Sequence, residues 1–213
     1  QLGMRDLALY AATAMLVNAP GILLLRVMNG AGLPWLARHQ EDQDAFSQRY
    51  RLFGAAIAGI SMVTFIPIIL LGTEIVALIF GQDFRAPALL MGWLAFGYFL
   101  RLLKAWPVIT ALALGDTKNV LIGNIVRPVG LIAALFVLHQ GGSLVAVAAA
   151  MVLGEVVALV ASLWRLSIVS KLPVLRDLAP LMLTTALATV AVGILWSLGN
   201  DISLLLGLVY TFT

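Results

Sequence analysis

Four ionisable residues lie inside long apolar stretches of the sequence: Arg101, Lys104, Arg127 and Glu155. The three cations among them could bind an anion. Arg101 and Lys104 are three residues apart, so they share one face of a helix. A cation near the centre of a bilayer costs at least about 3 kcal/mol on insertion scales. Three cations and one carboxylate leave a surplus of positive charge, which a dry core would not tolerate. We therefore expect a hydrated cavity whose ligand is an anion.

The type and setting of these cations favour a phosphate ligand. The planar guanidinium group of arginine can donate two parallel hydrogen bonds to a phosphate. Proline lies close behind the cations, since Pro107 follows Lys104 by three residues and Pro128 directly follows Arg127. A proline removes a backbone donor, so we expect a kink one turn beyond Leu103 and a loosened backbone beside Arg127. Interrupted helices are common at the midplane binding sites of transporters.

The depth of each charge can be counted from the cytoplasmic helix ends at ~1.5 Å per residue. Lys104, Arg127 and Glu155 then lie ~14–16 Å deep and Arg101 ~21 Å deep. Glu155 could form an ion pair with Arg127 or serve in coupling, and either role leaves Arg101 and Lys104 unpaired. We name Arg101, Lys104 and Arg127 as candidate substrate-binding residues. Arg26, shallower at ~10 Å, and Asn124 are possible further contacts.

Composition indicates an integral membrane protein. The chain has 213 residues, of which 62% are hydrophobic and 11% charged, whereas a soluble domain is about a quarter charged. The absence of cysteine excludes disulfides and thiolate metal sites. His39 and His139 are too far apart in sequence to suggest a metal site. Because no catalytic triad, nucleotide-binding loop or paired-carboxylate motif is present, we expect no enzyme activity, cofactor or metal. The formal net charge of +3 does not indicate nucleic-acid binding.

Apolar runs of about 20 residues predict an all-α protein with six membrane helices and the start of a seventh. We expect them at 7–33, 52–72, 86–115, 118–138, 144–164 and 178–198, with the seventh beginning at Asp201. Pro34 is expected to end the first helix. The chain has the character of a fragment truncated at both ends. We expect one helix bundle over 1–165 and additional membrane helices over 166–213.

The longest polar connection follows the first predicted helix. Phe46, Tyr50 and Phe53 in it repeat at helical spacing, which fits either a short helix on the membrane surface or a solvated loop with aromatic anchors. After the second helix, Thr73 and Glu74 are expected to cap a short turn that Gly81 ends.

Basic residues predict the orientation of the helices. Seven lie on one set of connections and two on the other: Arg38, Arg49, Arg51, Lys118, Arg165, Lys171 and Arg176 against Arg5 and Arg85. By the positive-inside rule, the first set faces the cytoplasm. Small residues recur every four positions along 144–164, at Ala146, Ala150, Gly154, Ala158 and Ser162. This stripe predicts the close approach of another helix.

Several segments carry a family resemblance. They are the run IILLGTEIVALIFGQDF, the helix FGYFLRLLKAWPVITALALGDTK, the stretch from GNIVRPVG to GEVVALV, and the N-terminal ALYAATAMLVNAPGILLLRVMNGAGLPWLARHQEDQDAFSQRYR. Together, over about 1–165, they resemble the C-terminal half of bacterial polysaccharide flippases. These belong to the multidrug/oligosaccharidyl-lipid/polysaccharide exporter superfamily. The resemblance implies one bundle of a two-bundle fold around a central cavity.

The resemblance also implies a substrate and a location. The substrate would be an oligosaccharide on a polyprenyl pyrophosphate, moved from the cytoplasmic to the outer leaflet of the bacterial inner membrane by alternating access. It would serve surface polysaccharides such as exopolysaccharide or O-antigen, alongside the polymerase and glycosyltransferases of the same pathway. Two alternatives stay open: a lipid-linked peptidoglycan-precursor flippase, and a non-transporting membrane scaffold whose charges pair helices.

Overall fold

The computed structural model describes residues 3–170, 172–174 and 176–197, and this part of the chain is helical throughout, without a strand. The elements are α1 (Met4–Ala37), α2 (Gln43–Phe80), η1 (Gln82–Phe84), α3 (Ala88–Ala113), α4 (Lys118–Val126), α5 (Pro128–His139), α6 (Leu144–Val169), η2 (Arg176–Leu178) and α7 (Ala179–Ser197). Six helical segments are long and apolar enough to cross a membrane, with α4 and α5 together forming one. The predicted all-α membrane architecture with six spans is confirmed. The expected start of a seventh helix lies outside the described residues.

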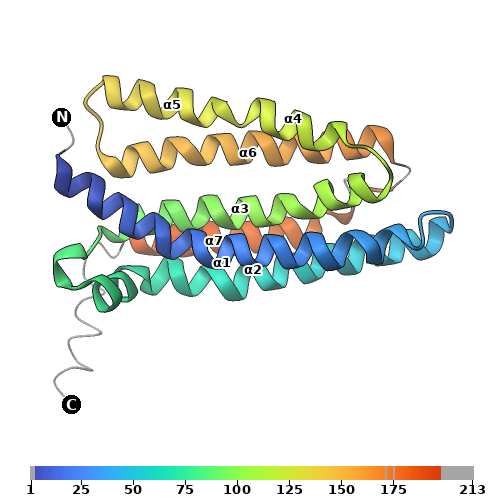
Figure 1. The fold of residues 1–213 in the computed structure, drawn as a ribbon, viewed down its shortest axis with the longest axis horizontal. Helices are drawn as coiled ribbons and strands as arrows, with labels where there is room; N and C mark the ends of the chain where they lie inside the picture. The colour runs from blue at the N-terminus through green and yellow to red at the C-terminus, as the bar shows by residue number, and fades with distance from the viewer. Residues whose placement is uncertain (1–2, 171, 175, 198–213) are drawn as a thin grey trace, which may run out of the picture.

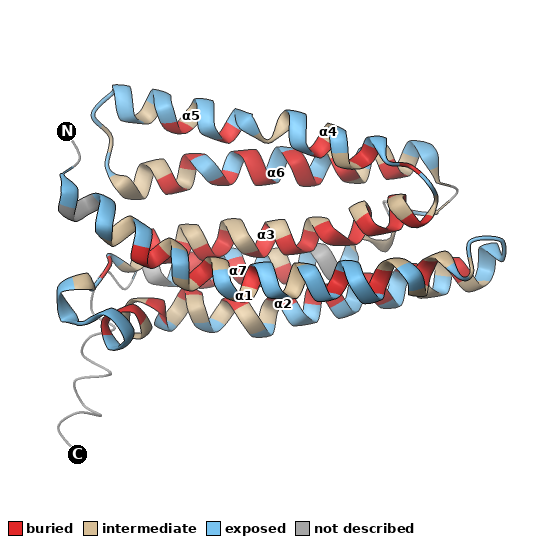
Figure 2. Cartoon of the chain, in the orientation of Figure 1, coloured by how far each residue is buried: buried red, intermediate tan, exposed pale blue. Residues whose placement is uncertain are grey.

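Helix α3 is the central helix of the bundle. It packs against α1, α2, α6 and α7, and 56% of its most apolar window is buried, against 17% to 39% in the other spans. Figure 1 shows α4 and α5 beside α6, α6 beside α3, and α1, α2 and α7 beyond α3. Buried residues face the helix contacts, whereas the outward faces are exposed (Figure 2). The exposed faces are rich in large apolar side chains such as Leu131 and Phe136, as lipid-facing surfaces should be.

The first helix does not end at Pro34 as predicted. It continues to Ala37, and the Arg38 N–H donates to the Pro34 carbonyl at 3.3 Å. Proline removes a single helical hydrogen bond, the one to the carbonyl four residues earlier, and membrane helices tolerate this loss. The expectation that proline must terminate the helix was therefore wrong.

Helix α2 begins far earlier than predicted and includes the aromatic repeat of the polar connection. Neither interpretation of Phe46, Tyr50 and Phe53 was right, because all three are buried in the core. The Tyr50 ring stacks on Trp106 of α3 with centroids 4.8 Å apart, and the Trp106 Nε1–H donates to the Tyr50 carbonyl at 3.0 Å. Asp42 caps the helix by accepting from the backbone of Asp44 and Ala45.

At its other end, α2 runs through Thr73 and Glu74, so the expected cap was wrong. Glu74 instead forms an ion pair with Arg85 beyond η1. The predicted stop at Gly81 is confirmed: its φ of 96° is the left-handed conformation that glycine adopts readily. Its N–H donates to the Ala77 carbonyl at 3.0 Å.

The predicted helix over 118–138 is interrupted at Arg127, between α4 and α5. Pro128 has no N–H to donate to the Asn124 carbonyl, so the hydrogen-bond ladder breaks there. Arg127 itself keeps helical dihedral angles, with φ −59° and ψ −36°, so the two halves stay nearly collinear (Figure 1). The loosened backbone predicted beside Arg127 is confirmed, whereas α3 remains one helix through Pro107.

The connections alternate between the two ends of the bundle. Residues 38–42 and 114–117 lie at one end, and 81–87 and 140–143 lie at the other (Figure 1). Two of the connections that the basic residues predict to be cytoplasmic, 38–42 and 114–117, therefore share one end.

Candidate functional site

The centre of the candidate site is an ion-pair cluster built on one carboxylate oxygen. Glu155 Oε1 accepts hydrogen bonds from Arg101 Nε at 3.1 Å and Nη2 at 2.6 Å, and it forms an ion pair with Arg127, whose Nε lies 2.8 Å away. Glu155 is only 6% exposed. Its other oxygen, Oε2, is buried and has no hydrogen-bond partner among the described residues. The carboxylate thus ties α6 both to α3 and to the α4–α5 junction.

Arg101 is therefore not the unpaired cation that the charge count suggested. The depth estimate placed it a helical turn away from Glu155, but the long arginine side chain spans that offset. Its guanidinium also lies over the Tyr98 ring, 4.4 Å from the centroid, in a cation–π contact. The pairing of Arg127 with Glu155, one of the two roles considered for the carboxylate, is present.

Lys104 differs from both arginines, because it forms no ion pair with a residue that the structure describes. It is half-buried and its ammonium lies beside Gly123 of α4. A Cβ placed on Gly123 would be 3.9 Å from Lys104 Nζ and 3.2 Å from Ser162 Oγ. The missing side chain at Gly123 leaves room for the ammonium group between α3 and α4.

Two cavities adjoin this cluster. The first, of about 190 Å³, is lined by Leu25, Asn29, Arg101, Lys104, Ala105, Val108, Ile109 and Arg127. It thus contains all three candidate cations and no carboxylate. The second, of about 380 Å³, is lined by Asn124, Arg127, Pro128, Leu131, Met151 and Glu155. Arg127 lines both cavities.

The small residues of α6 allow α4 and α5 to approach closely, as predicted. Four members of the stripe are buried and Ala146 is half-buried. Ser162 also accepts, through its carbonyl, a hydrogen bond of 2.9 Å from Asn119 Nδ2 of α4. This packing places the α4–α5 junction, and with it Arg127, against Glu155.

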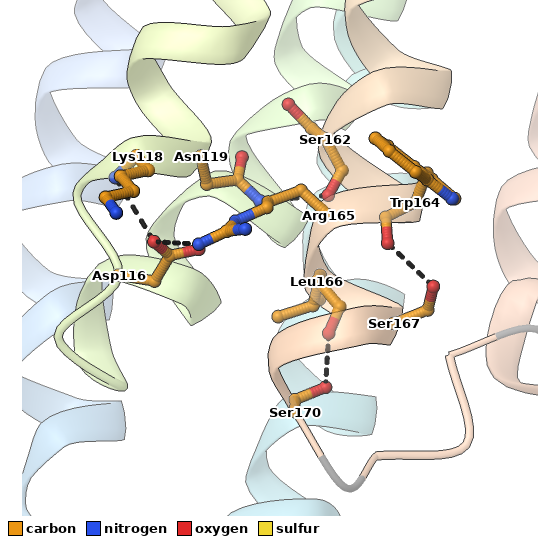
Figure 3. A network of polar contacts seen from close by, with 9 residues as sticks. All are labelled: Asp116, Lys118, Asn119, Ser162, Trp164, Arg165, Leu166, Ser167 and Ser170. Atoms are coloured by element: carbon orange, nitrogen blue, oxygen red, sulfur yellow. Dashed lines mark hydrogen bonds and ion pairs between the residues drawn. The ribbon is translucent and has the colours of Figure 1, made fainter.

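A polar network at the end of the bundle that holds residues 114–117 fixes the turn between α3 and α4 (Figure 3). Asp116 accepts from Arg165 Nε at 2.9 Å and Nη2 at 3.1 Å, and from the Lys118 N–H at 3.2 Å. The hydrogen bond from Arg165 is the main cause that holds the pKa of Asp116 below its ordinary value of 3.8. Because Arg165 belongs to α6, the pair fastens the α3–α4 turn to the helix that carries Glu155.

The N-terminal part of the chain matches one protein family. Residues 1–88 match the model of a family described as polysaccharide biosynthesis proteins. The resemblance to polysaccharide proteins is therefore confirmed over these residues, and it associates the chain with polysaccharide synthesis or export. No curated protein and no solved structure matches the chain. Its six spans fit a multi-pass membrane protein, and the match of residues 1–88 suggests a role in polysaccharide synthesis or export.

The matched segment covers α1, α2, η1 and the first residue of α3, and it ends before the four residues of the ion-pair cluster and its cavities. The functional role of Arg101, Lys104, Arg127 and Glu155 thus remains a prediction from their chemistry and geometry.

The two further candidates, Asn124 and Arg26, differ in their relation to the cavities. Asn124 is exposed and lines the larger cavity. Arg26 is exposed on α1 and lines neither cavity. Sequence analysis overlooked Asn29 and Tyr98, although Tyr98 lies one helical turn before Arg101, where a cation–π contact could have been sought. Among the described residues, no group of three or more His, Asp or Glu side chains is arranged to hold a metal ion.

Proposed function

We propose that this chain forms part of a transporter for a polyprenyl-pyrophosphate-linked oligosaccharide. The transporter moves its substrate from the cytoplasmic to the outer leaflet of the bacterial inner membrane, by alternating access, for surface polysaccharide biosynthesis. The observation that carries the proposal is the cavity of about 190 Å³ lined by Arg101, Lys104 and Arg127 without a carboxylate. The match of residues 1–88 to polysaccharide biosynthesis proteins supplies the chemical context.

The charge balance of the site favours a dianionic ligand. Glu155 offsets one of the three cations, and the remaining surplus suits a pyrophosphate linkage. The arginines supply planar donors that match phosphate oxygens, and Lys104 supplies an ammonium with no competing ion pair. A phosphate entering the cavity competes with Glu155 for Arg101 and Arg127, whereas it meets Lys104 without displacing a carboxylate. Lys104 is thus the first cation available to the ligand.

The interrupted backbone at Arg127 supports a binding site whose shape changes during transport. The break between α4 and α5 removes one hydrogen bond at the position that carries a candidate ligand-binding cation. A junction of this kind can adjust its angle at a lower cost than a continuous helix. We propose that the chain acts by binding and movement alone, without enzymatic chemistry or a cofactor. Its functional partners are the polymerase and glycosyltransferases of the same pathway.

Complementation of surface polysaccharide tests this function. The double variant Arg101→Gln with Lys104→Gln leaves Arg127 and Glu155 as a neutral pair, so the protein should fold while anion binding is lost. The control is Arg51→Gln with Arg85→Gln, which removes two cations outside the cavity, one near each end of α2. We expect normal membrane abundance for both variants and polysaccharide export only for the control. Full export by the cavity variant would contradict the proposal.

A non-transporting membrane scaffold is the second candidate, and one observation favours it. Glu155 joins two arginines from neighbouring helical segments, as a device that only holds helices together would do. A scaffold predicts that changes at Arg101 and Lys104 lower membrane abundance before they lower export. The same complementation experiment therefore separates the two candidates.

A further inference from the structure

We propose that Glu155 is the counter-ion that makes the bound anion releasable. It holds Arg101 and Arg127 while the cationic cavity is empty, and it competes with the anion for both arginines once the cavity is filled. The inference rests on the proposed function, because it concerns how the same site lets go of a pyrophosphate group. Glu155 does not line the cationic cavity, so it acts on the anion through the arginines, as a positioning residue.

The cationic cavity needs a group that limits its affinity. Arg101, Lys104 and Arg127 line it together, and no carboxylate does. Charges attract one another more strongly in a protein interior than in water. Differences in affinity between related complexes lie mostly in the dissociation rate, so an anion held by three uncompensated cations would leave slowly. A transporter must release its substrate in every cycle.

Glu155 occupies donors that an anion in the cavity would use. Arg101 donates to Glu155 Oε1 through Nε and Nη2, the two groups on one edge of its guanidinium. A phosphate that takes this edge displaces the carboxylate, whereas a phosphate on another edge shares the arginine with a second negative charge. The ion pair of Arg127 with the same oxygen has the same effect. In either arrangement Glu155 lowers the affinity for the anion.

The other oxygen of Glu155 provides the restoring force. Oε2 is buried and has no hydrogen-bond partner among the described residues, so the arginines compensate the charge through Oε1 alone. When an anion draws the arginines away, the carboxylate stays buried without compensation, which is unfavourable. This cost opposes tight binding and favours the return of the arginines to Glu155 as the anion leaves.

The arginines are better placed to move than the carboxylate. The side chains of Arg101 and Arg127 are 24% and 39% exposed, against 7% for Glu155. Arg127 also lies at the break between α4 and α5, where the backbone is less constrained. An exchange of partners therefore requires the guanidinium groups to turn, while Glu155 stays in its packed position on α6.

The test compares Glu155→Gln with wild type, because this change keeps the shape of the side chain and removes its charge. The matched control is Glu74→Gln, which makes the same change in the ion pair with Arg85 and lines neither cavity. The probe is a polyprenyl pyrophosphate bearing an oligosaccharide. Its affinity is measured on the intact purified protein, and its maximal rate of transfer between leaflets is measured in liposomes.

We expect Glu155→Gln to bind the lipid about tenfold more tightly or better, since hydrogen bonds to charged groups no longer have to be exchanged. The maximal rate should fall by a similar factor because release is slower, and the control should keep both wild-type values. A residue that only holds helices together predicts unchanged or weaker binding. Unchanged or weaker binding, or tighter binding at an unchanged maximal rate, would overturn the counter-ion role and leave the proposed function standing.

A second variant keeps the test decisive if Glu155→Gln does not fold. Glu155→Asp retains the charge and withdraws the carboxylate by one methylene, so its hold on the arginines is weaker. It should change the affinity and the maximal rate in the same directions by a smaller factor, and wild-type values would then overturn the counter-ion role. If wild-type protein does not bind the lipid at all, the proposed function fails and this inference fails with it.

Discussion

Gly154 of α6 packs against Gly130 of α5 with backbone directly facing backbone. A Cβ on Gly154 would lie 3.0 Å from the Gly130 nitrogen, and one on Gly130 would lie 2.8 Å from the Gly154 nitrogen. Real Cβ atoms essentially never lie closer than 3.0 Å to such atoms, so neither glycine can carry a side chain unless the two helices move apart. Arg127 lies three residues before Gly130 and Glu155 directly follows Gly154, so the glycine contact places the ion pair between the two helices.

A side chain at Gly154 should separate α5 from α6. We expect Gly154→Leu to destabilise the protein by about 3 kcal/mol or more, because the backbone of Arg127 and Gly130 cannot yield as a flexible side chain would. Gly59→Leu is the matched control, since nothing lies within 4 Å of a Cβ there. Thermal unfolding of the purified variants in detergent measures the difference. Equal unfolding temperatures would mean that α5 and α6 do not pack through these glycines.

The shared carboxylate predicts strong non-additivity between the two arginines. Arg127→Gln alone should cost about 1 kcal/mol, because Arg101 still donates twice to Glu155. The double change Arg101→Gln with Arg127→Gln leaves the buried carboxylate without a cation and should cost about 3–5 kcal/mol, more than the two single changes combined. A double-mutant cycle in thermal or denaturant unfolding measures the coupling. Additive effects would show that Glu155 does not bind both side chains.

The membrane spans could be predicted from sequence because long apolar runs depend on local composition alone. The ends of α2 could not, since its aromatic repeat near Tyr50 is buried by a distant residue, Trp106 of α3. A helical repeat of aromatic residues has the same appearance in sequence whether it faces the membrane surface or another helix. The unexpected continuation through Pro34 has a different cause, because one missing hydrogen bond does not stop a helix.

The composition of the candidate site was predictable, but its pairing was not. The depth count brought Arg127 and Glu155 to one level because it needs only the rise per residue. It could not place Arg101 beside Glu155, since that contact depends on the reach of the side chain across one helical turn. The second cavity could not be predicted either. It forms between α4–α5 and α6, and residues that line it, such as Met151, are of types that do not indicate a function in a sequence.

The orientation of the helices can be tested by labelling, since the chain has no natural cysteine. A cysteine at Gln43 should react only with reagents that reach the cytoplasm, and one at Gln140 only from outside. Both positions are exposed. Gln140 is preferable to Gly141, whose φ of 75° disfavours a side chain. If an impermeant reagent labels the cysteine at position 43 in intact cells, the predicted orientation is wrong.

The ion pair of Asp116 with Arg165 predicts an acid-sensitive contribution to stability. The folded protein lowers the pKa of Asp116 below 3.8, so it binds this proton more weakly than the unfolded chain does. The stabilisation is therefore present above about pH 4 and is lost as the pH falls through the folded pKa. The stability difference between wild type and Asp116→Asn should shrink on acidification. A difference that stays constant with pH would argue against the pair.

The most direct measurement of the proposed function is lipid translocation by the intact protein in liposomes. The substrate is a polyprenyl pyrophosphate bearing an oligosaccharide, and its transfer between leaflets is followed by accessibility to an impermeant reagent. We predict that wild-type protein accelerates transfer and that Arg101→Gln with Lys104→Gln reduces it to the rate of protein-free liposomes, at equal incorporation and unfolding temperature. Transfer by this double variant at the wild-type rate would contradict the anion-binding role of the cavity.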